Sequence, residues 1–432
     1  MESKSADIQR ALIVYVDFYK STTDDAFSEF VQLVDSAGLD VIGSIKAPRQ
    51  FPDAQLFVGK GKADEITMQA EELNADVVIF NHPLTPAQER NLENHIKVRV
   101  IDRIGLILDI FAQRARSYEG KLQVELAQLQ HLSTRLIRGW THLERQKGGI
   151  GLRGPGETQL ETDRRLVGFR IKLINQRLEK VRKQRYLSRQ QRKKNDVPVI
   201  SLVGYTNAGK STLFNRMSGA DVRAADQLFA TLDPTLRRVE MDSGRNIILT
   251  DTVGFIRDLP HDLVESFQAT LEEVREADLL IHVIDVDHEQ RQQRIDEVNK
   301  VIELIGAENV PQIEVYNKID KYSEQTARIE MADNYPHVRI WLSSQTGEGL
   351  ELLQEGIEQQ LRQDRKPHYL NLPVTAGQLR AKLFDLGAVR QDDENEKGGW
   401  IMEVELEDFR LIKLCEEASL DISQLQTEPA RY

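Results

Sequence analysis

An eight-residue phosphate-binding loop places the strongest constraint on this chain. Residues 204–211 read Gly-Tyr-Thr-Asn-Ala-Gly-Lys-Ser, a complete G-x-x-x-x-G-K-S pattern. The loop follows an apolar run at 197–203 and precedes a helical pattern at 213–217, which is the strand–loop–helix context that this motif requires. Backbone N–H groups of such a loop surround the β- and γ-phosphates, while Lys210 reaches the same phosphates and Ser211 ligates magnesium. The motif therefore predicts an α/β domain that binds a nucleoside triphosphate with magnesium.

Three later segments, each after an apolar run expected to form a strand, indicate that the base is guanine. Residues 251–254 read Asp-Thr-Val-Gly, which places Asp251 to hold magnesium through water and the Gly254 N–H group to meet the γ-phosphate. Residues 317–320 read Asn-Lys-Ile-Asp, and the Asp320 carboxylate suits the N1 and 2-amino hydrogens of guanine. Residues 343–345, Ser-Ser-Gln, can close over the base. This order of motifs predicts a guanine-nucleotide switch domain with a parallel sheet.

The predicted site draws on all of these motifs. The residues expected to act in hydrolysis are Lys210, Ser211, Thr231 and Gly254. Those expected to contact the nucleotide are Gly204, Tyr205, Thr206, Asn207, Ala208, Gly209, Lys210, Ser211, Phe229, Ala230, Thr231, Leu232, Asp233, Asp251, Thr252, Val253, Gly254, Asn317, Lys318, Ile319, Asp320, Ser343, Ser344 and Gln345. The predicted magnesium ligands are Ser211 and Thr231. Thr235 is the alternative to Thr231, but it follows Pro234 and more readily begins a strand, whereas residues 229–232 resemble the same region of the Obg-like GTPases.

The position after Gly254 departs from the pattern of Ras-like switch domains. Those enzymes place a water-orienting Gln there, and this chain has Phe255, whose ring cannot orient water by hydrogen bonding. Either a partner completes the site or another polar group substitutes. Asn207 suggests a potassium ion, because related GTPases with Asn at this point use it to hold one near the phosphates. The alternative is that Asn207 only hydrogen-bonds within the loop.

Charge is distributed unevenly along the 432 residues. The net charge is -12, yet residues 135–195 hold 18 Lys and Arg against 5 Asp and Glu. This segregation favours a basic face that meets a polyanion, and the alternative is a solvated helical face whose cations only aid solubility. No apolar run approaches the roughly 20 residues of a membrane span. The N-terminus lacks a signal-peptide pattern and the single Cys415 excludes an intramolecular disulfide, so a cytoplasmic location is expected.

The basic segment predicts an antiparallel helical hairpin over residues 121–196. Apolar residues recur at alternating spacings of four and three, which is typical of coiled-coil seams. They are Leu122, Leu126, Leu129, Leu136, Trp140 and Leu143, and then Val167, Ile171, Ile174, Leu178 and Val181. The Gly-rich loop 148–156 contains a G-x-G-x-x-G pattern, but it follows a helix rather than a strand and is therefore no dinucleotide fingerprint. Its glycines suit a close approach to RNA phosphates, and the alternative is a plain connector.

The two ends of the chain predict smaller α/β domains. Residues 1–120 alternate short strands, at 11–16, 40–44, 76–80 and 98–101, with stretches of helical length, which indicates a parallel sheet. Within them, residues 59–62, Gly-Lys-Gly-Lys, lack Walker spacing and are expected to form a turn or an RNA-facing surface. After the switch domain at 197–366, residues 367–432 read strand, helix, strand, helix. The expected fold class is therefore multidomain α/β.

These features together resemble the HflX family of ribosome-associated GTPases, within the Obg–HflX group, over nearly the whole chain. The most specific match is residues 154–165, Gly-Pro-Gly-Glu-Thr-Gln-Leu-Glu-Thr-Asp-Arg-Arg. The resemblance implies GTP and GDP as ligands and binding of the hairpin and loop 148–156 to the large ribosomal subunit and its rRNA. It also implies GTP-dependent dissociation of ribosomes into subunits, in rescue of stalled or stressed ribosomes. The protein is expected to be monomeric and cytoplasmic, with peripheral membrane association left open.

Two other functions remain open from the residues. The chain could be a GTP switch for a protein partner, with the hairpin as a helix–helix interface. It could also be an RNA remodeller or ribosome assembly factor in which residues 1–120 bind a second nucleotide, although they contain no second Walker loop. Salt separates the first alternative from rRNA binding, because cation–phosphate contacts weaken steeply as salt rises.

Overall fold

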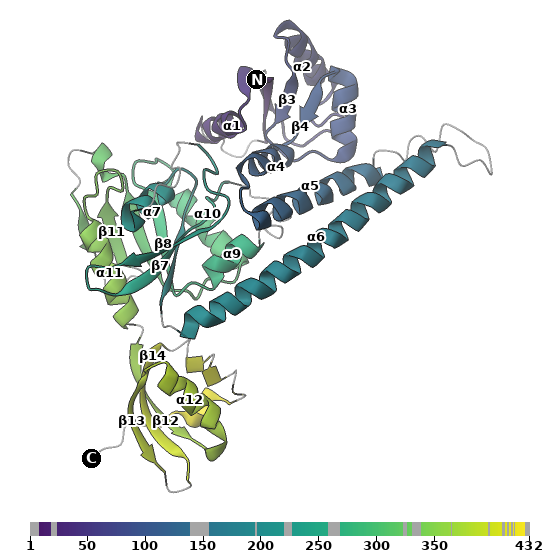
Figure 1. The fold of residues 1–432 in the computed structure, drawn as a ribbon. Helices are drawn as coiled ribbons and strands as arrows, with labels where there is room; N and C mark the ends of the chain where they lie inside the picture. Colours follow the sequence, from purple (N-terminus) through teal and green to yellow (C-terminus); the bar gives the residue numbers. More distant parts are fainter. Residues whose placement is uncertain are drawn as a thin grey trace, which may run out of the picture.

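Within the residues that the computed structural model describes, the chain forms three β-sheets, and a pair of long helices links the first sheet to the second (Figure 1). The described residues are 8–18, 24–138, 155–194, 197–219, 227–257, 268–322, 326–330, 338–363, 365–395, 398–407, 411–412, 414–415, 418 and 420–427. No helix in these ranges is long and apolar enough to cross a bilayer.

The N-terminal sheet has four parallel strands in the order β2-β1-β3-β4. Its strands are β1 (Arg10–Asp17), β2 (Asp40–Pro48), β3 (Val77–Phe80) and β4 (Arg99–Ile101). Its helices are α1 (Asp24–Ser36), α2 (Lys60–Glu72), α3 (Pro86–Ile96) and α4 (Arg103–Arg114). All strand pairs are parallel, which confirms the predicted sheet. Local signals fix the helix starts, because Thr85 and Gln88 form a capping box before α3 and Asp102 caps α4.

Two antiparallel helices, α5 (Tyr118–Arg138) and α6 (Pro155–Lys194), form a rod beside the two larger sheets (Figure 1). Their seam buries Leu122 and Leu126 against Ile174 and Leu178, which confirms the predicted packing at these positions. An ion pair of 2.6 Å between Arg170 and Glu125 joins the exposed sides of the helices. The side chains of Leu136, Trp140 and Leu143, and most of loop 148–156, lie outside the described residues.

The switch domain is built on a seven-stranded sheet of order β10-β11-β9-β8-β5-β7-β6. Its strands are β5 (Val199–Val203), β6 (Thr235–Glu240), β7 (Asn246–Asp251), β8 (Leu279–Asp285), β9 (Gln312–Asn317), β10 (Arg328–Glu330) and β11 (Val338–Leu342). The predicted parallel sheet is correct for the five inner strands, but β10 and β6 at the edges are antiparallel to their neighbours. The reason at one edge is a tight turn in which Gly244 has a φ of 79°, because a short turn can only join antiparallel strands.

Helices cover the sheet of the switch domain on both faces. They are α7 (Lys210–Ser218), α9 (Gln268–Arg275), α10 (Arg291–Leu304) and α11 (Leu350–Gln363). A continuous hydrophobic core joins this domain to the N-terminal one: Phe30 of α1 and Phe111 of α4 belong to the same buried cluster as Phe229 and Phe255. The two domains therefore share a dry interface rather than a flexible linker.

The C-terminal residues form a separate three-stranded antiparallel sheet of order β12-β14-β13 (Figure 1). Its strands are β12 (Arg365–Leu372), β13 (Val389–Glu394) and β14 (Trp400–Glu407), accompanied by α12 (Gly377–Asp385) and α14 (Ile422–Leu425). The sequence pattern predicted the first and last of these strands and the helix α12, but it missed β13. That strand is rich in charge and only partly buried, so it lacks the apolar alternation that marks a strand.

Candidate nucleotide-binding site

The phosphate-binding loop connects the carboxyl end of β5 to the first turn of α7. Two positions of the loop require glycine, because atoms of neighbouring segments lie too close to its backbone for a side chain. A Cβ atom on Gly204, where φ is 144°, would lie 2.3 Å from the carbonyl oxygen of Val283, and one on Gly209, where φ is 99°, would lie 2.2 Å from the Asn317 amide nitrogen. The motif therefore folds as its spacing predicts, packed against β8 and against the Asn-Lys-Ile-Asp segment.

Lys210 lies buried at the start of α7, with its ammonium directed back over the loop. Its Nζ donates to the carbonyl oxygens of Gly204 at 3.0 Å and of Tyr205 at 2.7 Å. Burial lowers the pKa of Lys210 to about 8, and the nearby Asp251 carboxylate opposes this shift. A phosphate group in the loop would supply the negative charge that such a buried cation lacks.

Three side-chain oxygens converge beside Lys210 in the arrangement expected of a magnesium site. Asp251 Oδ2 accepts hydrogen bonds from Ser211 Oγ and from Thr231 Oγ1, both at 2.8 Å, and the two hydroxyls are 2.9 Å apart. The other carboxylate oxygen, Asp251 Oδ1, is buried and has no side-chain or backbone partner among the residues that the structure describes. Burial raises the pKa of Asp251, and the Lys210 charge is the largest effect that opposes the rise. Hard oxygen donors with one acceptor left open fit Mg²⁺.

A cavity of about 180 Å³ opens in front of these groups. Its lining residues come from the loop, from the segment 227–231 and from the end of β7: Thr206, Asn207, Gly209, Lys210, Ser211, Thr212, Gln227, Phe229, Ala230, Thr231, Thr252 and Gly254. Most of the predicted phosphate-contacting residues are thus together. Thr212 and Gln227 were missed, because neither occupies a fixed position of a motif.

Asn317 connects the predicted base-binding segments by hydrogen bonds. Its amide nitrogen donates to the carbonyl oxygen of Ala208 at 2.8 Å, and its Oδ1 accepts from the N–H group of Ser344 at 2.9 Å. The Ser343 hydroxyl donates to Asp320, whose carboxylate remains exposed. These contacts hold the phosphate loop, the Asn-Lys-Ile-Asp segment and the loop 343–345 in one arrangement.

Several predicted contact residues direct their side chains elsewhere. Leu232, Val253 and Ile319 are buried in hydrophobic cores. The Asp233 carboxylate accepts from the N–H groups of Arg116 and Ser117, both at 2.7 Å, immediately before α5. These residues position the backbone around the cavity, and the motif spacing alone did not distinguish them from side chains that line it.

Tyr205 joins the phosphate loop to the N-terminal domain. Its hydroxyl donates to Glu29 Oε2 of α1 at 2.6 Å and accepts from the N–H group of Arg257 at 2.7 Å. Burial and the Glu29 charge raise the pKa of Tyr205, so its hydroxyl stays protonated as a donor. Arg103 of α4 completes the cluster, since its guanidinium donates to the Arg257 carbonyl oxygen at 2.8 Å.

Phe255 and Asn207 occupy opposite environments. Phe255 is 1% exposed, and its ring lies in the core shared with the N-terminal domain rather than in the cavity. Asn207 is exposed at the cavity rim, with a left-handed φ of 61°. Phe255 therefore cannot touch the nucleotide, while Asn207 can reach solvent ions beside it.

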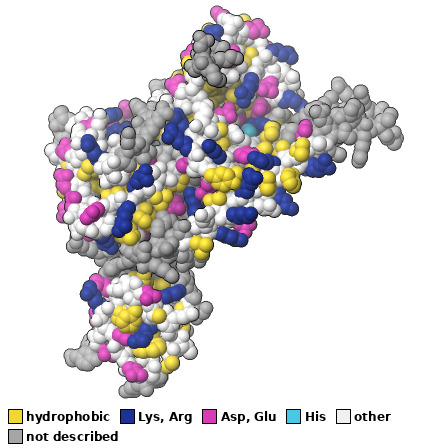
Figure 2. All heavy atoms as spheres, viewed as in Figure 1, with side chains coloured by type: hydrophobic (Ala, Val, Ile, Leu, Met, Phe, Trp, Pro, Cys, Tyr) yellow, Lys and Arg dark blue, Asp and Glu magenta, His cyan; other side chains and the backbone are white. Residues whose placement is uncertain are grey.

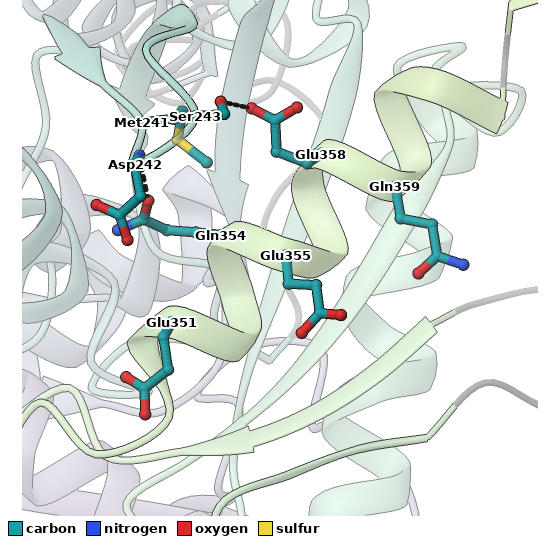
Figure 3. Close-up of a pocket in the computed structure, with 8 residues that line it drawn as sticks. All are labelled: Met241, Asp242, Ser243, Glu351, Gln354, Glu355, Glu358 and Gln359. Carbon is teal, nitrogen blue, oxygen red and sulfur yellow. Dashed lines mark hydrogen bonds between the residues drawn. The ribbon is translucent and has the colours of Figure 1, made fainter.

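A second cavity, of about 610 Å³, lies between the β6–β7 turn and α11 (Figure 3). Figure 3 shows Glu351, Glu355 and Glu358 projecting from successive turns of α11, with Asp242 opposite them. Among the described residues, its lining contains no cationic side chain. Carboxylates would repel phosphates, so this cavity does not compete with the loop as the nucleotide site.

The loop, the three oxygens and the guanine-specific segments define a GTP-hydrolysing P-loop protein. Three family models match consecutive parts of the chain: GTP-binding GTPase N-terminal at residues 24–112, GTP-binding GTPase Middle Region at 114–192, and 50S ribosome-binding GTPase at 199–318. Curated proteins named "GTPase HflX" are also 46–52% identical to the chain over more than nine-tenths of its length, so the chain belongs to the HflX family of GTPases.

Curated relatives match almost the entire chain. It is 52% identical to "GTPase HflX" of Escherichia coli, over 95% of this chain and 96% of that protein. It is 46% identical to "GTPase HflX" of Caldanaerobacter subterraneus subsp. tengcongensis, over 92% and 91%. Among solved structures, it is similar to a GTP-binding protein from the archaeon Sulfolobus solfataricus in complex with GDP, with 25% identity, a TM-score of 0.44, and 82% of this chain and 99% of that chain covered.

Proposed function

We propose that this GTPase binds the large ribosomal subunit and separates ribosomes into subunits when GTP is bound, in rescue of stalled or stressed ribosomes. The observation that best supports the proposal is that Thr231 hydrogen-bonds to Asp251 in the expected magnesium site, while Asp233, two residues later, binds the backbone just before the basic helical pair. A family model described as a 50S ribosome-binding GTPase also matches residues 199–318. A change from GTP to GDP would then be transmitted directly to the RNA-facing surface.

In this proposal, the site residues act on GTP as their geometry allows. Lys210 binds the β- and γ-phosphates, the N–H group of Gly254 meets the γ-phosphate, and Asp320 selects guanine. Ser211 and Thr231 would hold magnesium directly and Asp251 through water. When bound, the ion neutralises the charge that develops on the phosphates.

The transmission step runs from Thr231 to α5. Thr231 Oγ1 is bound to Asp251, and two residues later Asp233 holds both the backbone of Ser117 and its hydroxyl, at 2.7 and 2.6 Å. Ser117 in turn caps α5 by accepting from the N–H group of Gly120 at 2.8 Å. In switch domains, loss of the γ-phosphate releases the segment that it had ordered. In this chain, hydrolysis would therefore release Thr231, and with it the contact between Asp233 and the cap of α5.

The exposed side of α6 suits rRNA. Arg164, Arg165 and Lys172 are exposed along it, and Figure 2 shows Lys and Arg spheres distributed over this part of the molecule. Leu166 and Phe169 are 59% and 68% exposed between these cations. Cations bind phosphates, and an exposed aromatic ring can stack on an unpaired base.

We further propose the domain boundaries that the sequence predicts. Residues 1–120 form the N-terminal domain, 121–196 the RNA-facing hairpin with loop 148–156, 197–366 the GTPase domain and 367–432 the C-terminal domain. The protein would act as a monomer in the cytoplasm, where ribosomes are. Peripheral membrane association is the other location that the resemblance leaves open.

Potassium is proposed as a second cation beside the phosphates, held by Asn207. Its exposed position on the cavity rim supports this assignment. GTPase rates measured in potassium and sodium buffers of equal ionic strength should differ about 10-fold, as expected for an added cation at the transferring phosphate. Asn207→Ala should remove the difference, and equal rates in the two buffers for the unchanged protein would eliminate the potassium ion.

The proposed function is tested by sedimentation. Purified ribosomes are mixed with the protein and a non-hydrolysable GTP analogue, with GDP as the control, and are separated on a sucrose gradient. Splitting with the protein on the large subunit is the expected result. Binding without splitting would indicate an assembly or anti-association role, and no co-migration at low salt would exclude a ribosomal partner.

A matched pair of variants tests the RNA-facing surface. Arg164→Glu with Arg165→Glu reverses two charges on α6, and Arg237→Glu with Arg238→Glu reverses two on β6 of the GTPase domain. Only the first pair should lower ribosome affinity and reduce its salt dependence. Equal losses from both pairs would indicate a general charge effect rather than a docking surface.

A further inference from the structure

Thr206 lies at the second variable position of the phosphate loop. Its hydroxyl has no role in the nucleotide site as described above. The residue lines the phosphate cavity and is only 4% exposed. Its Oγ1 atom is buried and has no hydrogen-bond partner among the described residues. A buried hydroxyl without a partner destabilises the folded chain, so such a group on a residue beside a ligand cavity points to a partner that it gains when the ligand binds and the side chain turns toward it.

The backbone fixes Thr206 at the point where hydrolysis would occur. Its N–H group donates to the carbonyl oxygen of Phe255 at 2.7 Å, which ties the loop to the segment after β7. A Cβ atom built on Gly254 would lie 2.8 Å from Thr206 Cγ2 and 3.0 Å from Lys210 Nζ. Thr206 and Lys210 thus flank Gly254, whose N–H group is expected to meet the γ-phosphate.

The residue that orients water in Ras-like enzymes is absent here. Phe255 occupies that position and its ring is buried in the interdomain core. Its carbonyl oxygen already accepts from Thr206, so the contribution of this residue is to hold Thr206 in place. A hydroxyl can both donate and accept, which is what a group that positions a water molecule against a phosphate requires.

We propose that the Thr206 hydroxyl hydrogen-bonds the attacking water in GTP hydrolysis and replaces the missing Gln. In the step, the water oxygen forms a bond to the γ-phosphorus and the bond from that phosphorus to the β–γ bridging oxygen breaks. GDP leaves with the bridging oxygen, and the proton of the water passes to a γ-phosphate oxygen. Thr206 is unchanged at the end. The inference rests on the proposed placement of GTP in this cavity and not on ribosome binding.

A second buried hydroxyl provides a matched control. Thr250 Oγ1 in β7 also lacks a hydrogen-bond partner within the described ranges, and the side chain is fully buried. Thr250 does not belong to the cavity lining. Replacing either Thr by Val removes one hydroxyl that has no partner and keeps the shape of the side chain. The two variants therefore compare the loss of such a hydroxyl beside the phosphate cavity with its loss away from that cavity.

The test compares Thr206→Val, Thr206→Ser and Thr250→Val of the full chain. Single-turnover GTP hydrolysis should slow roughly 10- to 100-fold in Thr206→Val, as expected for one hydrogen bond to a charged transition state. Thr206→Ser should retain most of the rate, and Thr250→Val all of it. Affinities for GDP and for a non-hydrolysable GTP analogue should be unchanged in all three.

A second readout separates water positioning from structure. GDP with aluminium fluoride mimics the transferring phosphate, and its binding should weaken in Thr206→Val while GDP binding does not. An unchanged hydrolysis rate in Thr206→Val would overturn the proposal. So would a parallel loss of GTP and GDP affinity, which would make Thr206 a ground-state binding residue. Failure of the unchanged protein to bind GTP would instead refute the nucleotide site itself.

Discussion

The carboxyl ends of the two parallel sheets differ in whether their polar groups are satisfied. In the N-terminal sheet, Asn81 follows β3 and holds both backbone groups of Val16 on β1: its Oδ1 accepts at 2.8 Å and its Nδ2 donates at 3.1 Å. In the GTPase sheet, Thr206 and Asp251 at the corresponding edge each keep a buried oxygen without a partner in the described part of the chain. At these residues the N-terminal edge is closed on itself and the GTPase edge stays open, although Arg103 Nε, just after β4, also lacks a partner among the described residues.

This difference points to a functional residue only where the unsatisfied group lies beside the cavity, because Thr250 Oγ1 is also unsatisfied within the described ranges yet Thr250 does not line it. A buried polar group with all its hydrogen bonds made stabilises the fold, whereas one left open costs stability until a ligand arrives.

Removing the lysine of the phosphate loop should have the largest effect. Lys210→Ala deletes the only loop side chain expected to meet the β- and γ-phosphates, and GTPase kcat/KM should fall by about three orders of magnitude. Lys60→Ala is the matched control, because Lys60 lies exposed at the start of α2 in the similar Gly-Lys-Gly-Lys segment. A comparable loss in Lys60→Ala would revive a second nucleotide site in the N-terminal domain.

The fold was largely predictable, because the N-terminal sheet and the five inner strands of the GTPase sheet follow from apolar runs that alternate with helical stretches. Motif spacing also brought together most of the residues around the phosphate cavity, while their roles toward magnesium and the base remain predictions. What the motifs did not contain is the interface between domains. Tyr205 occupies a variable loop position, yet its hydroxyl binds Glu29, 176 residues away in the chain. Contacts of this kind depend on how domains pack, and no local pattern encodes them.

Neutralising the Asp320 carboxylate should change which base the site selects. Asp320→Asn replaces an acceptor pair by an amide that can donate to the 2-oxo group of xanthine, so preference should shift from GTP toward XTP by about 100-fold. Competition binding with both nucleotides measures the shift. Asp287→Asn is the control, since Asp287 is ion-paired with Lys321 in the same region. Unchanged selectivity in Asp320→Asn would remove Asp320 from base recognition.

The closed edge should respond in stability rather than in catalysis. Asn81→Ala leaves the N–H group of Val16 without its buried partner, while His82 Nε2 still contacts the Val16 carbonyl oxygen at 2.9 Å, and should destabilise the chain by about 2 kcal/mol. Urea unfolding measures this loss, and Asn94→Ala on the exposed face of α3 should change little. GTP hydrolysis below the unfolding transition should remain normal. A specific loss of kcat in Asn81→Ala would break the distinction between closed and open edges.

The smallest effect tests how the open edge communicates with the hairpin. Asp233→Ala removes the carboxylate that holds Ser117, the capping residue of α5, and an exposed cap contributes only about 1 kcal/mol. GTP affinity should therefore stay within a few-fold of the original, because Asp233 lies outside the cavity lining. Ribosome binding should lose its preference for the GTP form over GDP, since the contact between segment 227–233 and α5 is broken. Asp233→Asn keeps an acceptor oxygen for the Ser117 backbone and should retain part of that preference. If both variants discriminate GTP from GDP on the ribosome as the unchanged protein does, the signal reaches the hairpin by another route, and the Tyr205–Glu29 contact is the next to test.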